Sequence, residues 1–140
     1  MTVVDTTILR YTAGDDDPLK GPCQQLMQRH LDHRLELSTT VEVIQEFAHT
    51  YARRRPRAVA VAQARRFATV LRVLVVTAED LDLGLTIFES TSRLGGFDCV
   101  LAAAAINNRA EALISADQAF GEVPGLRWLD PRSPEIAGLG

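Results

Sequence analysis

The residues best suited to chemistry in this sequence are four carboxylates that follow predicted strands or lie in the first two turns of predicted helices. They are Asp5, Glu46, Asp98 and Asp117. In a parallel sheet with helices on both faces, the functional crevice lies at the carboxyl ends of the strands, where helix N-termini also point. We therefore expect the four side chains to meet at one edge of a sheet.

Converging carboxylates repel one another unless a cation joins them. Asp5 comes directly after a buried strand, where an unpaired charge is costly to desolvate. Glu46 interrupts an otherwise apolar run, and Glu42 one turn earlier adds a like charge on nearly the same face. Hard oxygen ligands without a nearby cysteine or a histidine cluster suit Mg²⁺ or Mn²⁺. The pattern therefore predicts a divalent-metal site.

Two of these acids also have a purely structural interpretation. Asp98 and Asp117 both stand at the start of a predicted helical segment, and aspartate in that position most often acts as an N-cap. Sequence alone leaves both interpretations open for each residue.

Short apolar runs that alternate with helical periods predict the elements that position these acids. Strands are predicted at residues 2–4, 35–37, 73–76, 112–114 and 126–129, and helices at 19–31, 41–54, 56–72, 77–93 and 99–108. Their alternation predicts a single domain over residues 1–140, with a three-layer α/β/α fold and a central, mostly parallel sheet of four to five strands. The strands that carry a charge, at Glu36 and Arg127, are expected nearer the edges of the sheet.

The length and composition of the chain limit the kind of protein that it can be. A chain of 140 residues can bury a core without disulfides or a metal. Cys23 and Cys99 have no C-x-x-C spacing and are expected to be free, buried thiols. No apolar stretch approaches the roughly 20 residues of a membrane span, and no basic-then-apolar signal opens the chain. We expect a soluble, cytoplasmic protein.

The charges of the chain are distributed unevenly. Residues 53–72, which we call the arginine segment, carry seven arginines and no acid; the whole chain has a net charge of −3, which leaves −10 for the remainder. The seven are Arg53, Arg54, Arg55, Arg57, Arg65, Arg66 and Arg72. Such a segment is either a solvated helix face or a surface for phosphates or an acidic partner segment.

Four stretches, in order and spread over the whole chain, resemble the four motifs of PIN-domain nucleases. They are residues 3–9 (VVDTTIL), 43–48 (VIQEFA), 97–104 (FDCVLAAA) and 114–120 (ISADQAF). Each motif alone is short, but the four together with the placement of acids after strands are fairly specific. Within the family, the length and simplicity of the chain resemble the VapC-type toxins of type II toxin-antitoxin systems.

The resemblance implies a Mg²⁺-dependent (or Mn²⁺-dependent) endoribonuclease in which the four acids bind one or two metal ions and are catalytic. Such a metal lowers the pKa of bound water and clamps the oxygens of an in-line displacement at phosphorus. The hydroxyls of Thr6 and Ser115 are implied to support the acids or bound water, although the family often has Thr where Ser115 stands. Some relatives have a further acid shortly after the fourth; Gln118 follows here, which implies a weakly held second metal.

The resemblance also implies partners. They are a VapB-type antitoxin, an RNA substrate and a second copy of the chain in a homodimer. Possible RNA contacts are Arg10, just after the first motif, and Arg53, Arg54, Arg55 and Arg57 in the arginine segment. Arg10 can equally be an ordinary surface arginine.

Other functions fit these residues less well. A receiver-type phosphorylation domain needs a lysine late in the chain, and the only lysine is Lys20. A haloacid-type phosphatase needs an aspartate two residues after the first, where Thr7 stands. Cys23, His30 and His33 have a spacing that could bind zinc, but no fourth ligand is close by in sequence. The more serious alternative is a catalytically inactive PIN-like module that binds RNA or a protein.

Overall fold

Five short strands form one sheet in the computed structural model, which describes residues 1–140. They are β1 (Thr2–Val4), β2 (Leu37–Thr40), β3 (Arg72–Leu74), β4 (Ala112–Ile114) and β5 (Trp128–Leu129). The strand order is β3-β2-β1-β4-β5, and every pairing is parallel. The strands therefore all end along one side of the sheet, which we call the carboxyl edge, and β1 lies at the centre.

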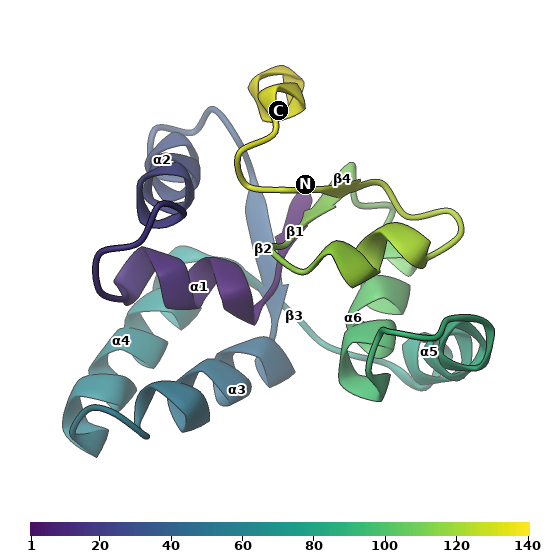
Figure 1. Ribbon diagram of the computed structural model, residues 1–140, viewed down its shortest axis with the longest axis horizontal. Helices are drawn as coiled ribbons and strands as arrows, with labels where there is room; N and C mark the ends of the chain where they lie inside the picture. The colour runs from purple at the N-terminus through teal and green to yellow at the C-terminus, as the bar shows by residue number, and fades with distance from the viewer.

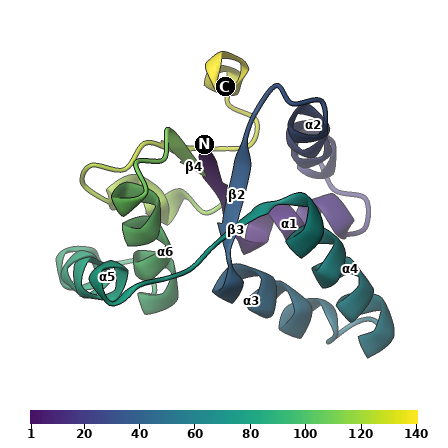
Figure 2. The ribbon, with the colours of Figure 1, turned by 180° about the vertical axis from the view of Figure 1, so that it is seen from behind.

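Helices cover both faces of this sheet. The α-helices are α1 (Thr6–Ala13), α2 (Lys20–Leu31), α3 (Val41–Tyr51), α4 (Arg57–Val70), α5 (Ala78–Ser90) and α6 (Gly96–Asn107), and the 3-10 helices are η1 (Gln118–Glu122) and η2 (Pro134–Gly138). α1, α2 and α4 lie on one side of the sheet, and α5 and α6 lie on the other (Figure 1, Figure 2). The predicted three-layer α/β/α fold is confirmed. None of these helices has the length and apolar character needed to cross a bilayer.

α1 is a helix that the sequence pattern does not predict. Its first residues, Thr6 and Thr7, are poor helix formers, so local propensity gives little signal. Asp5 caps the helix by accepting hydrogen bonds from the backbone N–H groups of Thr7 and Ile8. Ile8 and Leu9 are fully buried. Capping and packing therefore outweigh the weak propensity.

β2 is also shifted relative to the prediction. The strand begins at Leu37 and runs through three hydroxyl residues to Thr40, whereas the apolar pattern placed it at residues 35–37. The hydroxyls are buried, and Thr39 Oγ1 donates a hydrogen bond to the carbonyl of Val4 at 2.9 Å. Glu36 lies outside the strand. The prediction that this strand lies near an edge of the sheet is wrong, because β2 has a neighbouring strand on both sides. β5 does lie at an edge, as predicted.

The topology brings four helix starts to the carboxyl edge. α1 and α3 begin directly after β1 and β2, and η1 begins shortly after β4. α6 precedes β4 and must return to the opposite edge before that strand begins, so its N-terminus also lies at the carboxyl edge. One cluster of 33 buried residues underlies all of these elements. The segments that carry the four acids are therefore fixed on a shared core.

Gly84 sets the spacing between α5 and α6. A Cβ at this position would lie 2.7 Å from Val100 Cγ2 and 2.8 Å from Val100 Cα. We predict that Gly84→Ala lowers the free energy of unfolding by about 1–3 kcal/mol, because a backbone atom of α6 cannot move aside without repacking the layer. Urea denaturation followed by circular dichroism measures this change.

Gly21→Ala is the matched control for that substitution. Gly21 is also helical, and a Cβ there would meet nothing within 4 Å. Alanine at this position should change the free energy of unfolding by less than about 1 kcal/mol, because Gly21 lies in the first turn of α2 and precedes Pro22, which offsets the helix propensity that alanine adds. If Gly84→Ala and Gly21→Ala change the free energy of unfolding equally, the close approach of the two helices does not limit residue size.

Candidate active site

Asp5, Glu46, Asp98 and Asp117 are called the acidic cluster below, and Asp5 is its most buried member. Only 4% of the residue is exposed. Its Oδ1 accepts hydrogen bonds from Thr7 Oγ1 at 2.5 Å and Thr7 N at 3.1 Å, and its Oδ2 accepts one from Ser115 Oγ at 2.6 Å. Burial raises the pKa of Asp5 from 3.8 to about 6, although these donors act in the opposite direction. The orientation of the carboxylate is therefore fixed before any ligand binds.

Asp98 has no such donors. It is the third residue of α6, whose N-cap is Gly95, and its carboxylate accepts no hydrogen bond from the protein. Burial, followed by the nearby charges of Asp5, Glu46 and Asp117, raises the pKa of Asp98 from 3.8 to about 7. The N-cap interpretation is wrong for Asp98. Its three charged neighbours are the other acids that the sequence singled out.

Glu46 reaches the cluster from α3. Val43 and Phe47 on the same helix are buried, while Glu46 itself is exposed toward the carboxyl edge. Thr6 Oγ1 donates a hydrogen bond to Glu46 Oε2 at 2.8 Å and so links the first turn of α1 to α3. The carboxylate keeps one oxygen without a protein donor.

Asp117 is both a cap and a member of the cluster. Its Oδ1 accepts a hydrogen bond from Ala119 N at 2.9 Å and caps η1, as the structural interpretation expects. The backbone N–H of Asp117 donates to Ser115 Oγ at 2.9 Å. Its second carboxylate oxygen accepts no hydrogen bond from the protein, so capping leaves one oxygen of Asp117 for a ligand.

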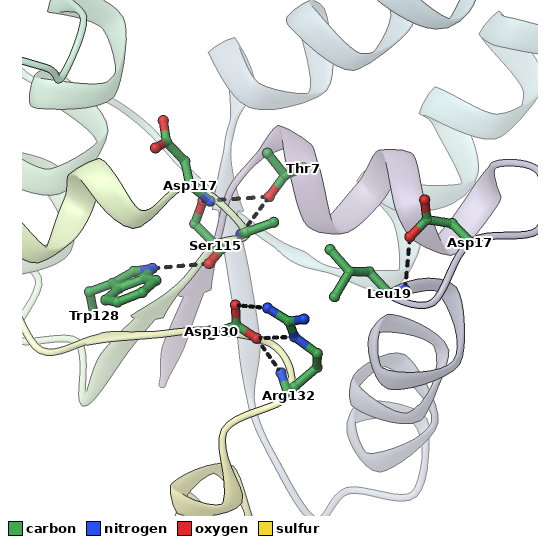
Figure 3. A network of polar contacts seen from close by, with 9 residues as sticks. Thr7, Asp17, Leu19, Ser115, Asp117, Trp128, Asp130 and Arg132 are labelled. Atoms are coloured by element: carbon green, nitrogen blue, oxygen red, sulfur yellow. Dashed lines mark hydrogen bonds and ion pairs between the residues drawn. The ribbon is translucent and has the colours of Figure 1, made fainter.

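Thr7 is a site residue that the sequence analysis missed. Its hydroxyl donates to Asp5 Oδ1, accepts a hydrogen bond from Ala116 N at 3.0 Å and lies 3.5 Å from Ser115 Oγ. Figure 3 shows Thr7 facing the segment that carries Ser115 and Asp117. A hydroxyl two residues after an N-cap aspartate is the sequence signal that could have indicated this role.

The arginines named as possible RNA contacts differ in their surroundings. Arg10, Arg53, Arg54 and Arg57 are exposed and form no ion pair. Arg55, in contrast, pairs with Asp15 at 2.8 Å, and its guanidinium lies 4.3 Å from the centre of the Tyr51 ring. Arg55 therefore links the segment after α3 to the loop after α1, which leaves Arg10, Arg53, Arg54 and Arg57 as the named arginines without an acidic partner.

The zinc alternative is wrong. His30 Nε2 lies 2.9 Å from the carbonyl of Val70, and its Nδ1 lies 3.1 Å from the N–H of Leu37, so both ring nitrogens are engaged. Cys23 and Cys99 are free and buried, as predicted. Burial raises the pKa of the Cys23 thiol to about 12, which leaves it inert as a ligand or nucleophile.

The donor set of the cluster fits a hard divalent cation. All the side-chain groups that converge are carboxylate or hydroxyl oxygens, which Mg²⁺ and Mn²⁺ prefer. No three acidic, histidine or cysteine side chains are arranged close enough to hold a metal ion as they stand. The acids are close enough to raise the pKa of Asp98, so a cation would have to draw their free oxygens inward.

A family model described as "PIN domain" matches residues 2–126 of this chain. The chain belongs to the PIN-domain family. The matched region includes every residue of the acidic cluster. The sequence is also 44% identical to Ribonuclease VapC7 of Mycobacterium tuberculosis over 141 residues, covering 99% of this chain and 97% of that protein. The chain is therefore a VapC-type PIN-domain protein.

Solved structures have the same PIN fold. VapC20 of Mycobacterium tuberculosis, described as a sarcin-ricin loop cleaving toxin, matches with a TM-score of 0.73 and 22% identity over 86% of this chain and 93% of that chain. The VapBC2 complex of Rickettsia felis, bound to a promoter DNA fragment, matches with a TM-score of 0.75 and 14% identity over 92% of this chain and 97% of that chain. At these identities the likeness extends to the fold alone.

Proposed function

We propose that this PIN-domain protein is the toxin component of a type II toxin-antitoxin system and cleaves RNA as a Mg²⁺-dependent endoribonuclease. The observation that carries the proposal is Asp98, a partly buried carboxylate without a protein donor that faces the charges of three other acids. Such an arrangement destabilises the folded chain unless a cation binds to it. The chain is 44% identical to a protein named as a ribonuclease, which supports RNA as the substrate.

Asp5, Glu46, Asp98 and Asp117 would hold the Mg²⁺ or Mn²⁺. When bound, the cation lowers the pKa of a water molecule and offsets negative charge on the phosphate. Asp5 is fixed by its donors and would be a rigid ligand, whereas Asp98 accepts no hydrogen bond from the protein that would have to break before it binds a cation. All four acids would be catalytic, because each would contact the bound metal.

Two hydroxyls orient the acids. Thr6 donates to one oxygen of Glu46 and leaves the other available, and Ser115 donates to Asp5 while its oxygen accepts the N–H of Asp117. Ser115 therefore couples the position of Asp5 after β1 to the position of Asp117 after β4. With Gln118 in place of a further acid, we expect one metal to be held more tightly than a second.

The proposed partners follow from the same family membership. The structures with a similar fold include VapBC complexes, which supports a VapB-type antitoxin as the partner of this chain in the cytoplasm. A homodimer is the proposed assembly. α5 exposes Leu81, Leu85 and Phe88 along one face, at 49%, 56% and 51% exposure, which is compatible with a contact between two copies.

Cleavage of a circular single-stranded RNA tests the proposed activity, since a circle has no ends and only an endonuclease can open it. We predict no cleavage after treatment with a chelator and recovery when Mg²⁺ or Mn²⁺ is restored, because the acidic cluster needs a cation to activate water. Gel electrophoresis separates circular from linear product. Retention of RNA in a binding assay without cleavage at any Mg²⁺ concentration would instead indicate a catalytically inactive binding module.

A further inference from the structure

Trp128 lies beside the acidic cluster on the edge strand β5. Its indole N–H donates a hydrogen bond to the backbone carbonyl of Ser115 at 3.0 Å. The hydroxyl of the same Ser115 donates to Asp5 Oδ2 at 2.6 Å and accepts the N–H of Asp117 at 2.9 Å. Figure 3 shows Trp128 and Asp117 on either side of Ser115. One residue therefore connects the indole to two acids of the site.

The indole replaces a donor that the sheet cannot provide. In the β4–β5 ladder, Leu113 N donates to Arg127 O and Ser115 N donates to Leu129 O. The next donor in this alternating pattern would be the N–H of residue 131, which would bond the carbonyl of Ser115. Residue 131 is Pro131, which has no N–H.

Ser115 therefore needs the indole to complete its hydrogen bonding. The residue is fully buried, so an unpaired carbonyl there would be unfavourable. The Trp128 ring is itself held in place, since it is partly buried against the core and a Cβ on Gly121 would lie 3.3 Å from its Cε3. The position of Ser115 is thus set in part by a side chain that packs against the core.

We propose that Trp128 is a positioning residue for the active site: its N–H fixes the turn from Ser115 to Asp117 and thereby the relative placement of Asp5 and Asp117. The catalytic part of this inference rests on the proposed nuclease function, while the positioning itself does not. Trp128 does not act on the substrate. It acts through Ser115, so its loss should weaken metal activation more than RNA binding.

The test compares Trp128→Phe with the wild-type protein. Phenylalanine keeps an aromatic ring on the edge strand and removes the N–H. We expect amide hydrogen exchange at Ala116 and Asp117 to become at least about tenfold faster, with exchange in β1 unchanged, because the turn can then open locally. We expect kcat to fall about tenfold and the Mg²⁺ concentration for half-maximal activity to rise several-fold, while KM for RNA stays within about twofold.

Leu126→Ala is the matched control, since Leu126 packs against the same core next to β5 but makes no contact in this hydrogen-bond network. It should lower the melting temperature without altering exchange at Ala116 and Asp117 or the Mg²⁺ dependence. Unchanged exchange at these two amides in Trp128→Phe would overturn the positioning role. Faster exchange in Trp128→Phe, together with a wild-type protein that never cleaves RNA, would reject the nuclease function and keep the positioning role.

A measurement on the unmodified protein covers the case in which Trp128→Phe does not fold. Trp128 is the only tryptophan, so its indole N–H gives a single assignable signal in a ¹H–¹⁵N spectrum. We expect this proton to exchange as slowly as the amides of β4. Exchange at the rate of a free indole would show that the hydrogen bond to Ser115 is not maintained and would overturn the proposal.

Discussion

Asp98→Asn should reduce cleavage by about 10³-fold or more and, in the absence of metal, make the folded protein more stable. The loss of activity follows because an amide is a neutral and weaker ligand, and a bound cation supplies several kcal/mol of transition-state stabilisation. The gain in stability follows because the ionised carboxylate is partly buried without a donor and lies among three like charges. Allowing for its partial exposure to solvent, we expect an increase of about 1–2 kcal/mol at pH 8.

The pH dependence of stability gives this prediction a definite sign. Asp98 has a pKa of about 7 in the folded chain and 3.8 as its ordinary value. Between these values the folded chain binds the proton and the unfolded chain has lost it, so wild-type stability falls as pH rises through this window. Asparagine has no such titration. The stability difference between variant and wild type should therefore grow from about pH 4 to pH 7 and then level off.

Urea denaturation across this pH range, with and without Mg²⁺, measures both effects. Added Mg²⁺ should stabilise the wild type and close the gap to Asp98→Asn, since a cation binds the folded site and not the unfolded chain. Asp82→Asn on the exposed face of α5 is the control for removal of one negative charge; it should change neither activity nor the pH profile. A loss of stability in Asp98→Asn would mean that the carboxylate supports the fold and does not strain it.

The part of the site that sequence could predict is the part set by topology. Parallel strands end at one edge, so Asp5 after β1 and Asp117 after β4 had to lie near each other once the strands were placed correctly. Asp98 followed for a similar reason, because the helix before β4 must start at the same edge. These placements depend on strand order and direction, which alternating apolar and helical patterns reveal.

The remaining features depend on contacts between distant segments. Thr7 bonds to Ala116 and lies against Ser115, more than 100 positions away in sequence, and no local pattern indicates that approach. Arg55 has the same local appearance as Arg54, but only Arg55 meets Asp15 and stacks on Tyr51. Propensity also misplaced the hydroxyl-rich β2, because burial and packing in the centre of a sheet decide such a strand.

Replacing Arg53, Arg54 and Arg57 with glutamine should weaken binding of single-stranded RNA by about 10- to 100-fold at low salt. All three are exposed and have no acidic partner: Arg53 and Arg54 follow α3, and Arg57 opens α4. The connection between α3 and α4 lies at the end of these helices farther from the sheet (Figure 1). Removing one arginine–phosphate interaction should flatten the dependence of log affinity on log salt by about 0.7, so removing three would lower the slope by about 2. Fluorescence anisotropy of a labelled RNA at several salt concentrations measures this slope. The titrations use proteins that also carry Asp98→Asn, which prevents cleavage of the RNA.

A triple variant with the same change in net charge separates a local surface from a general electrostatic effect. Arg34, Arg109 and Arg127 are exposed and lie at the amino edge of the sheet, before β2, after α6 and before β5; Arg34 pairs with Asp32 and Arg127 pairs with Glu135. Their replacement with glutamine should leave the salt slope nearly unchanged, and neither triple variant should shift the free energy of unfolding by more than about 1 kcal/mol, because exposed charges contribute little to folding. Equal loss of affinity in both variants would mean that RNA responds only to total charge. An unchanged slope in the first variant together with loss of antitoxin binding would assign the arginine segment to the protein partner, whose acidic residues it would then engage.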